Sequence, residues 1–488
     1  MARQSVVALG LGTLCLLISC QSRPVVNNHV QANGTVSRLN LDQAVEDLDY
    51  FFRTVEKVHP NHLANLSKQD YKQLKKRSRA TLELAGEKAG YISKPVLALT
   101  VAEAAAALGD GHTFGRLDAD LIDPCDDSAC MPPFRMGWQA GHVVVSDTRE
   151  DLRHIKGAQL LRINDRPLAE VLAPIVAKCS GERWENRISD FLREQDLYWA
   201  LVRPVEGRQM TLAVQQTTGE AQTLTVDLIP LDRYRKEVPP GPSRPSWGYY
   251  ELHQNDRTCY WQYNSCNPTA QGRQFIESVF QAIQDRRAQN LILDLRFNGG
   301  GSDEAVRAVV DHLTSKPYRL YSRVGGRVSD ALLRTDPRWY LRPLRGLRLS
   351  LPVRARPPGE VKNRFEGSVY VLTSPSTFSA AADLAAVLKD HRLATLIGEE
   401  TGGVRRTFGE AYGHRLPNSG VEFSVSGKFF HAPIPQPDDA KRGTVPDIVL
   451  TPELLAPFRG YGNPEVVYVL DLIQKRTTSS QQPLTAGE

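Results

Sequence analysis

The fold is decided by the stretch Asn290-Leu291-Ile292-Leu293-Asp294-Leu295-Arg296-Phe297-Asn298-Gly299-Gly300-Gly301. Its apolar run predicts a buried strand that ends at a turn. Three consecutive glycines let the backbone adopt positive φ and bring unhindered N–H groups close to a ligand oxygen, and Ser302 then begins a helical pattern with a cap. The turn therefore predicts an anion-binding site, with an ordinary strand-to-helix connection as the alternative.

A second strand-to-helix corner follows about eighty residues later. Residues 368–373 are typical of a strand, and residues 380–389 are typical of a helix. Ser379 lies between them, so its hydroxyl is expected to be accessible with the N–H of Ala380 beside it. A serine nucleophile needs this arrangement.

Three motifs now resemble, in order and spacing, the C-terminal processing and tricorn family of serine peptidases. They are Asp294 to Gly301, Thr377-Phe378-Ser379-Ala380-Ala381 and Ile397-Gly398-Glu399-Glu400-Thr401-Gly402-Gly403, and Gly443 to Ile448 is similar to the closing turn of that family. The resemblance covers roughly residues 38 to 475. It implies an α/β multidomain protein with an N-terminal helical cap, a PDZ-like β module and a crotonase-like or ClpP-like α/β catalytic core, acting on polypeptide substrates.

The resemblance also implies a general base for Ser379. One branch of the family uses a lysine, but Val404 stands at that position, and the neighbouring Arg405 cannot serve because a guanidinium is not deprotonated in proteins. The tricorn-like branch uses a histidine from the N-terminal part, and Gly109-Asp110-Gly111-His112-Thr113 resembles that motif. We therefore expect His112 to be the base. The expected oxyanion donors are the N–H groups of Gly300 or Gly301 and of Ala380.

The sequence does not identify the acidic residue that would orient the histidine. A family glutamate precedes the closing turn, but Ala440-Lys441-Arg442 occupies that approach. The nearest carboxylates are Asp438 and Asp439, with Glu422 a further candidate. Asp447 is expected to cap the closing loop, and Asp294 is expected to form a structural pair with Arg296. Two function classes follow: a serine endopeptidase, or a catalytically inactive homologue that binds peptides or envelope proteins.

Composition supports an ordinary globular protein. The chain has 488 residues, 41% of them hydrophobic, and a formal net charge of +5, which fits about three domains. Arginine is concentrated between Lys316 and Arg364, where a solvated insertion is favoured over a surface for anionic partners. The sequence carries no nucleic-acid-binding motif and no cysteine–histidine cluster with zinc spacing, so neither nucleic acid nor a metal or other cofactor is expected.

The first twenty residues predict an export signal, because their apolar run is too short to span a membrane. Leu17-Ile18-Ser19-Cys20 resembles a bacterial lipobox, which implies cleavage before Cys20 and a lipid on its sulfur; simple signal cleavage is the alternative. Gln21 favours the outer membrane, facing the periplasm. In an oxidising compartment Cys125 and Cys130 are expected to form a disulfide, whereas Cys259 and Cys266 lie too far apart along an extended segment.

The remaining patterns predict the domain boundaries. After a tether at 21–37, a helical domain is expected at 38–132, with helices near 41–52, 71–84 and 95–108. Short alternating segments at 133–232 predict the PDZ-like module, which includes a hairpin turned at Gly219 and an inserted helical stretch near 172–199. A Pro/Gly-rich linker at 233–246, the catalytic domain at 247–475 and a disordered tail at 476–488 complete the chain.

Overall fold

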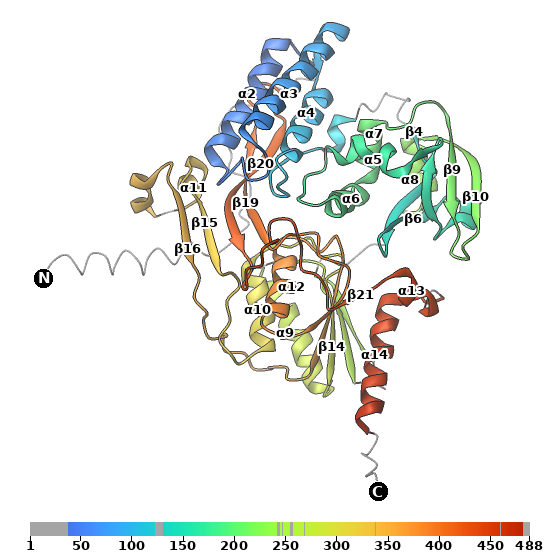
Figure 1. Cartoon of the computed structure of the whole chain (residues 1–488), viewed down its shortest axis with the longest axis vertical. Helices are drawn as coiled ribbons and strands as arrows, with labels where there is room; N and C mark the ends of the chain where they lie inside the picture. The colour runs from blue at the N-terminus through green and yellow to red at the C-terminus, as the bar shows by residue number, and fades with distance from the viewer. Residues whose placement is uncertain are drawn as a thin grey trace, which may run out of the picture.

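A computed structural model of the chain describes residues 38–122, 130–241, 245, 247–253, 257–267, 269–336, 338–458 and 460–481. The predicted export signal, the lipidated Cys20, the tether and Cys125 lie outside these residues, and so does most of the predicted tail. Figure 1 shows a helical bundle, a β module beside it and a layered α/β domain below both.

The N-terminal helices form as the periodicity predicts. They are α2 (Leu41–Val58), α3 (Lys68–Ala89) and α4 (Lys94–Ala106). Asn40 and Gln43 form a capping box at the start of α2, and Gly90 ends α3 in the left-handed conformation that glycine adopts without strain. The bundle does not close its core alone. Phe51 packs edge-on against Phe423 of the neighbouring sheet, with ring centroids 5.2 Å apart, so the bundle is fixed to that sheet.

The β module is an antiparallel sheet in the order β10-β9-β7-β6-β5. The strands are β5 (Phe134–Gln139), β6 (His142–Thr148), β7 (Gln159–Ile163), β9 (Gln209–Gln215) and β10 (Ala221–Asp227). The predicted hairpin is β9–β10, and Gly219 turns it with a φ of 93°. The predicted helical insertion consists of α5 (Leu168–Val176), α6 (Trp184–Arg193) and α7 (Gln195–Val202).

The domain expected to be catalytic is built on a six-stranded sheet in the order β12-β13-β14-β17-β18-β21. Its strands are β12 (Tyr249–His253), β13 (Thr258–Gln262), β14 (Asn290–Asp294), β17 (Ser368–Thr373), β18 (Thr395–Gly398) and β21 (Ile448–Val449), and only β12 runs antiparallel to its neighbour. The main core lies between this sheet and α9 (Ala270–Asp285), α10 (Asp303–Leu313) and α12 (Ala380–Asp390). The carboxyl ends of parallel strands β14 and β17 therefore meet at one edge, where both predicted turns lie.

A second antiparallel sheet joins the helical bundle to the catalytic domain. It contains β16 (Arg348–Pro352), β15 (Arg323–Arg327), β20 (Glu422–His431) and β19 (Arg406–Arg415), and the short β3 (Phe114–Gly115) pairs with β20. Because β3 directly follows the Asp110–Thr113 loop, this pairing carries the loop to the catalytic domain. The arginine-rich segment is a folded part of the same sheet, since it supplies β15, α11 (Asp330–Thr335) and β16.

Two predicted boundaries fall inside helices. The first residues of the expected linker belong to α8 (Leu231–Glu237), and the expected tail begins within α14 (Pro464–Gln481). Among the described residues, none of the helices is long and apolar enough to cross a membrane. Cys259 and Cys266 are free thiols, as their predicted separation requires.

Candidate active site

Ser379 occupies a strained corner between β17 and α12. Its φ is 52° and its ψ is −132°, a backbone conformation that residues other than glycine adopt only at a cost of about 1–3 kcal/mol. The corner is held from both sides: Phe378 N donates to the Asn298 carbonyl at 3.0 Å, and Thr377 Oγ1 donates to the Leu295 carbonyl at 2.8 Å. The glycine turn thus supports the serine corner.

His112 reaches Ser379 from the helical domain. Its Nε2 lies 2.9 Å from Ser379 Oγ, within hydrogen-bond distance. The imidazole stacks on the Phe378 ring, with centroids 4.8 Å apart and planes inclined by 25°. Gly111 allows this packing, because a Cβ there would lie 2.6 Å from the Phe378 ring. The sequence prediction that these two residues meet therefore agrees with their placement.

Asp110 is a buried carboxylate that organises the histidine loop. Its Oδ1 accepts from His112 N at 2.9 Å, and its Oδ2 accepts from His59 Nε2 at 3.0 Å, Thr113 Oγ1 at 2.6 Å and Ser426 Oγ at 2.7 Å. Burial alone would raise the pKa of Asp110, but these hydrogen bonds and the nearby histidines hold it well below its usual range. His59 Nδ1 accepts from Asn61 N, so the proton of His59 is on Nε2, facing Asp110.

The His112 imidazole is suited to accept a proton. Burial lowers its pKa below 6.5, although the charge of Asp110 and the backbone of Phe408 counteract part of this effect. Within the described part of the chain Nδ1 of His112 is buried and forms no well-formed hydrogen bond. The neutral form therefore prevails at pH 7.

The predicted oxyanion donors differ in their availability. Gly300 N donates to Asn298 Oδ1 at 2.9 Å, so this N–H is used within its own turn. Gly301 forms a bridge with Cys266, but the hydrogen bonds of this bridge use the Gly300 carbonyl and Ser302 N rather than Gly301 N. Ala380 N lies at the start of α12, beside Ser379, where the N–H groups of a helix attract negative charge. Of the three, Ala380 is placed most directly for an oxyanion on a substrate held at Ser379.

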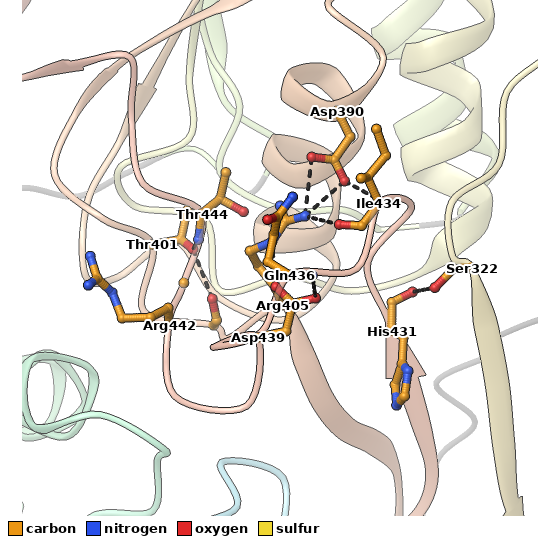
Figure 2. A network of polar contacts seen from close by, with 12 residues as sticks. Ser322, Asp390, Thr401, Arg405, His431, Ile434, Gln436, Asp439, Arg442 and Thr444 are labelled. Carbon is orange, nitrogen blue, oxygen red and sulfur yellow. Dashed lines mark hydrogen bonds and ion pairs between the residues drawn. The ribbon is translucent and has the colours of Figure 1, made fainter.

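The structure does not place the predicted orienting acids at His112. Asp439 Oδ1 accepts from Arg405 Nε at 2.9 Å, and Asp390 accepts from the same guanidinium (Figure 2). Asp438 is exposed, and Glu422 forms ion pairs with surface arginines. The position of Asp439 before the closing turn predicts that it lies at the histidine. Sequence position alone does not show that Asp439 binds the buried Arg405 instead.

The lysine alternative also finds no support at the corner. Val404, at the position of the family lysine, is buried and forms a bridge with Gly443. Lys389 instead pairs with Asp447 at 2.8 Å, and Asp447 Oδ2 accepts from Leu396 N, so Asp447 caps the closing loop as expected. The expected structural pair of Asp294 and Arg296 is present with a separation of 2.6 Å, buried at the edge of the sheet.

Sequence reasoning missed two neighbours of this site. His59 follows α2 and precedes Pro60, and nothing in the surrounding sequence indicates a role in the site. Glu182 precedes α6 and lies against Gly111: its Oε1 accepts from Thr407 Oγ1 at 3.2 Å, and a Cβ on Gly111 would lie 3.1 Å from its Oε2. Neither position carries a local signal, because each contact joins segments far apart in the chain.

A cleft of about 550 Å³ lies between β5 of the β module and the carboxyl ends of the catalytic strands. Its lining includes Trp138, Arg193, Phe297, Ser376 and Glu399. It is large enough for several residues of an extended chain. Within the described residues, His, Cys, Asp and Glu side chains form no group of three or more that could hold a metal ion.

Comparison with known proteins matches residues 257–449 to the family described as Peptidase family S41. Two solved structures share the architecture. The crystal structure of mature CPAF is 15% identical, with 89% of this chain and 98% of that chain covered and a TM-score of 0.59. The structure of mature CPAF complexed with lactacystin is also 15% identical, with 89% of this chain and 99% of that chain covered and a TM-score of 0.60. At 15% identity these TM-scores show a shared fold alone. Residues 257–449 of this chain are similar to peptidase family S41, a family of serine peptidases.

Proposed function

We propose that this protein is a serine endopeptidase in which Ser379 is the nucleophile and His112 the general base. The observation that carries the proposal is the 2.9 Å contact between His112 Nε2 and Ser379 Oγ, which brings together two domains and two sequence motifs. A hydroxyl becomes an effective nucleophile only when a base takes its proton, and a histidine that is neutral at pH 7 is such a base.

The reaction proceeds through an acyl-enzyme. His112 Nε2 takes the proton of Ser379 Oγ as the oxygen attacks the scissile carbonyl carbon. The N–H of Ala380 and the start of α12 stabilise the resulting oxyanion. His112 then gives its proton to the leaving amine nitrogen as the C–N bond breaks. Water, activated by the same histidine, hydrolyses the ester and restores Ser379.

Asp110 assists this reaction from behind the histidine. Its carboxylate fixes the loop through His112 N and keeps a buried negative charge near the imidazole. A nearby negative charge stabilises the imidazolium that forms when Ser379 is deprotonated. Asp110 accepts from the backbone of His112 rather than from its ring. It therefore fixes the loop and stabilises the positive charge of the imidazolium, but it does not orient the ring directly.

The cleft beside β5 is the proposed path of the polypeptide substrate. β5 is an edge strand, and strands of this kind can pair with an extended peptide. At Met136, however, the side chain of Gln195 already occupies the edge, accepting from Met136 N at 2.8 Å and donating to the Met136 carbonyl at 3.0 Å. A peptide would therefore pair with β5 only beyond Met136, unless Gln195 moves away.

A fluorophosphonate probe tests the proposal, because it reacts with activated serines. The wild-type protein should be labelled and should cleave a disordered polypeptide, and Ser379→Ala should lose both properties while remaining folded. Ser368→Ala, which changes an exposed serine at the start of β17, is the matched control and should behave as the wild type. Equal labelling of Ser379→Ala would refute the nucleophile. A folded wild type without labelling or cleavage would instead indicate the inactive homologue.

We further propose export and anchoring by a lipid on Cys20, on the evidence of the apolar run and the lipobox-like Leu17-Ile18-Ser19-Cys20. The anchored protein would act in the bacterial envelope, at the outer membrane facing the periplasm. Cys20→Ala should move the protein from a membrane fraction to a soluble one. A mature N-terminus at another position without acyl groups, measured by mass spectrometry, would contradict lipidation.

A further inference from the structure

Glu182 lies against Gly111, the residue before the proposed base His112, and takes no part in the proposed reaction steps. Two buried side-chain atoms beside Gly111 form no well-formed hydrogen bond among the described residues: Nδ1 of His112 and Oε2 of Glu182. The Oε2 atom lies against Gly111, the residue directly before His112, because a Cβ built on Gly111 would lie 3.1 Å from it. Burying an ionisable carboxylate is costly, so the presence of Glu182 beside the base needs an explanation.

The segment that carries Glu182 is fixed to both halves of the active site. Ser180 Oγ donates to the Thr113 carbonyl at 2.8 Å, which joins the segment to the histidine loop. Arg183 Nη1 donates to the Thr401 carbonyl at 2.8 Å, which joins it to the catalytic domain. Glu182 itself accepts from Thr407 of β19. Its carboxylate is therefore held between the two domains that supply His112 and Ser379.

Glu182 also lines an open cavity of about 460 Å³ that is shared with Gly109 of the histidine loop and with Ala440 and Lys441. Ala440 brings no polar side chain to this wall. Asp438 is exposed and Asp439 is bound to Arg405, so this stretch of the closing loop places neither of its carboxylates at His112. Solvent in the cavity gives Glu182 a route for gaining and losing a proton.

We propose that Glu182 is a positioning residue of the Ser379–His112 pair. Its carboxylate supports the Gly111–His112 segment and, when ionised, stabilises the imidazolium that forms as His112 takes the proton of Ser379. The inference deepens the proposed function and rests on it. No atom of Glu182 forms or breaks a covalent bond; the proton moves from Ser379 Oγ to His112 Nε2 and then to the leaving amine.

The electrostatic surroundings make this support dependent on pH. Burial, and next the charge of Asp110, raise the pKa of Glu182 to about 7, whereas the backbone N–H groups of Glu182 and Gly111 and the Thr407 hydroxyl lower it. The charged groups on the elements packed around Glu182 are Asp110 and His112 on the histidine loop, Arg183, Glu185 and Arg187 on its own segment and α6, and Lys441 on the closing loop. Arg183 is engaged by Glu400 at 2.9 Å.

Two ionisations then shape the reaction. His112 must be neutral, which its lowered pKa ensures above about pH 6.5. Glu182 must be ionised, which happens as the pH rises through about 7. The rate of wild-type protein should therefore rise with a midpoint near 7, set by Glu182. When the charge of Glu182 is removed, only the ionisation of His112, which has the lower pKa, should determine how the rate depends on pH.

The experiment measures the second-order rate of fluorophosphonate labelling against pH for the wild type and Glu182→Gln. The variant should react about tenfold more slowly at pH 8, which is the effect on the rate of lowering the pKa of the base by about one unit. The midpoint of its pH–rate profile should lie below that of the wild type. Glu182→Asp keeps the carboxylate and should recover part of the rate. Glu185→Gln, which removes a carboxylate three residues away that pairs with Arg183, is the matched control and should keep the wild-type profile.

The outcomes separate the two proposals. If the wild type is not labelled at any pH, the proposed peptidase function fails. If the wild type is labelled but Glu182→Gln keeps its rate and midpoint, the role of Glu182 is refuted and the peptidase stands. Melting temperatures show whether the glutamine variant is folded. If it is not, Glu182→Asp decides: a changed rate and midpoint support the role, and a wild-type profile refutes it.

Discussion

His112 and Ser379 are hydrogen-bonded across 267 residues of sequence, with Nε2 2.9 Å from Oγ. The pairing of β3 with β20 makes this contact possible, because Phe114 and Gly115 pair with Ser424 and Phe423 just after the histidine loop. The histidine therefore belongs to one domain and contacts the serine of another. Any change that loosens the contact between bundle and sheet is expected to lower activity before it unfolds the catalytic domain.

Removing the base is the first prediction. His112→Ala should lower peptide turnover and fluorophosphonate labelling by about a hundredfold or more, because general-base catalysis contributes at least that factor. Lys389→Met is the control, since it removes a lysine whose ammonium group bonds to Asp447 and to the Val445 carbonyl of the closing loop, away from His112. An active His112→Ala protein, together with an inactive lysine variant, would return the protein to the lysine branch.

Asp110 supplies a prediction on stability. Asp110→Asn should lower the free energy of unfolding by about 3 kcal/mol at neutral pH, because a buried carboxylate that accepts from His59, Thr113 and Ser426 is replaced by a neutral amide. The pKa of Asp110 is lowered on folding, so its stabilisation is present above its unfolded value of 3.8 and is lost as the pH falls below it.

Urea unfolding across the acid range checks this expectation. The difference between the wild type and Asp110→Asn should be largest near neutrality and should shrink below about pH 4. A difference that grows as the pH falls would have the wrong sign and would mean that the carboxylate is not ionised in the folded protein.

How far the sequence predicts this molecule depends on whether a signal is local. The buried run through Leu293, the three glycines and the helix after Ser379 are neighbours in sequence, so β14, β17 and α12 followed from patterns. The contact of His112 with Ser379 is distant and was reached only through resemblance to a family. The carboxylates had no such guide. Asp439 binds Arg405 and Glu182 faces Gly111 because of packing between domains, which no spacing records.

Gly300 supplies a prediction on geometry. Its φ is 104°, and a Cβ there would lie 2.6 Å from Ser379 Cβ and 2.8 Å from the Phe378 carbonyl oxygen. Gly300→Ala should therefore displace the serine corner and lower labelling by about a hundredfold, because small errors in position have large effects on rate. Gly219→Ala is the control: its φ is 93°, but a Cβ there meets nothing within 4 Å. Similar losses in both variants would show that general destabilisation, rather than collision with Ser379, is responsible.

Asp439 tests whether the site has been assigned correctly. Its side chain and that of Arg405 are 5% and 7% exposed, and Asp390 shares the same guanidinium (Figure 2). Breaking a buried pair leaves an uncompensated charge and costs about 3–5 kcal/mol. Asp439→Asn should therefore lower the melting temperature clearly, and Asp390→Asn should do the same, because both remove a charge from one arginine.

Neither variant should move the midpoint of the pH–rate profile, because neither carboxylate bonds to His112 within the described residues. The comparison is made at a temperature at which both variants are folded, with labelling rates measured across neutral pH. If Asp439→Asn alone shifted the midpoint and slowed labelling by about a hundredfold, while Asp390→Asn did not, Asp439 would act on the histidine in solution. The sequence-based expectation for the orienting acid would then hold against the contacts seen here, and Glu182 would lose the role proposed for it.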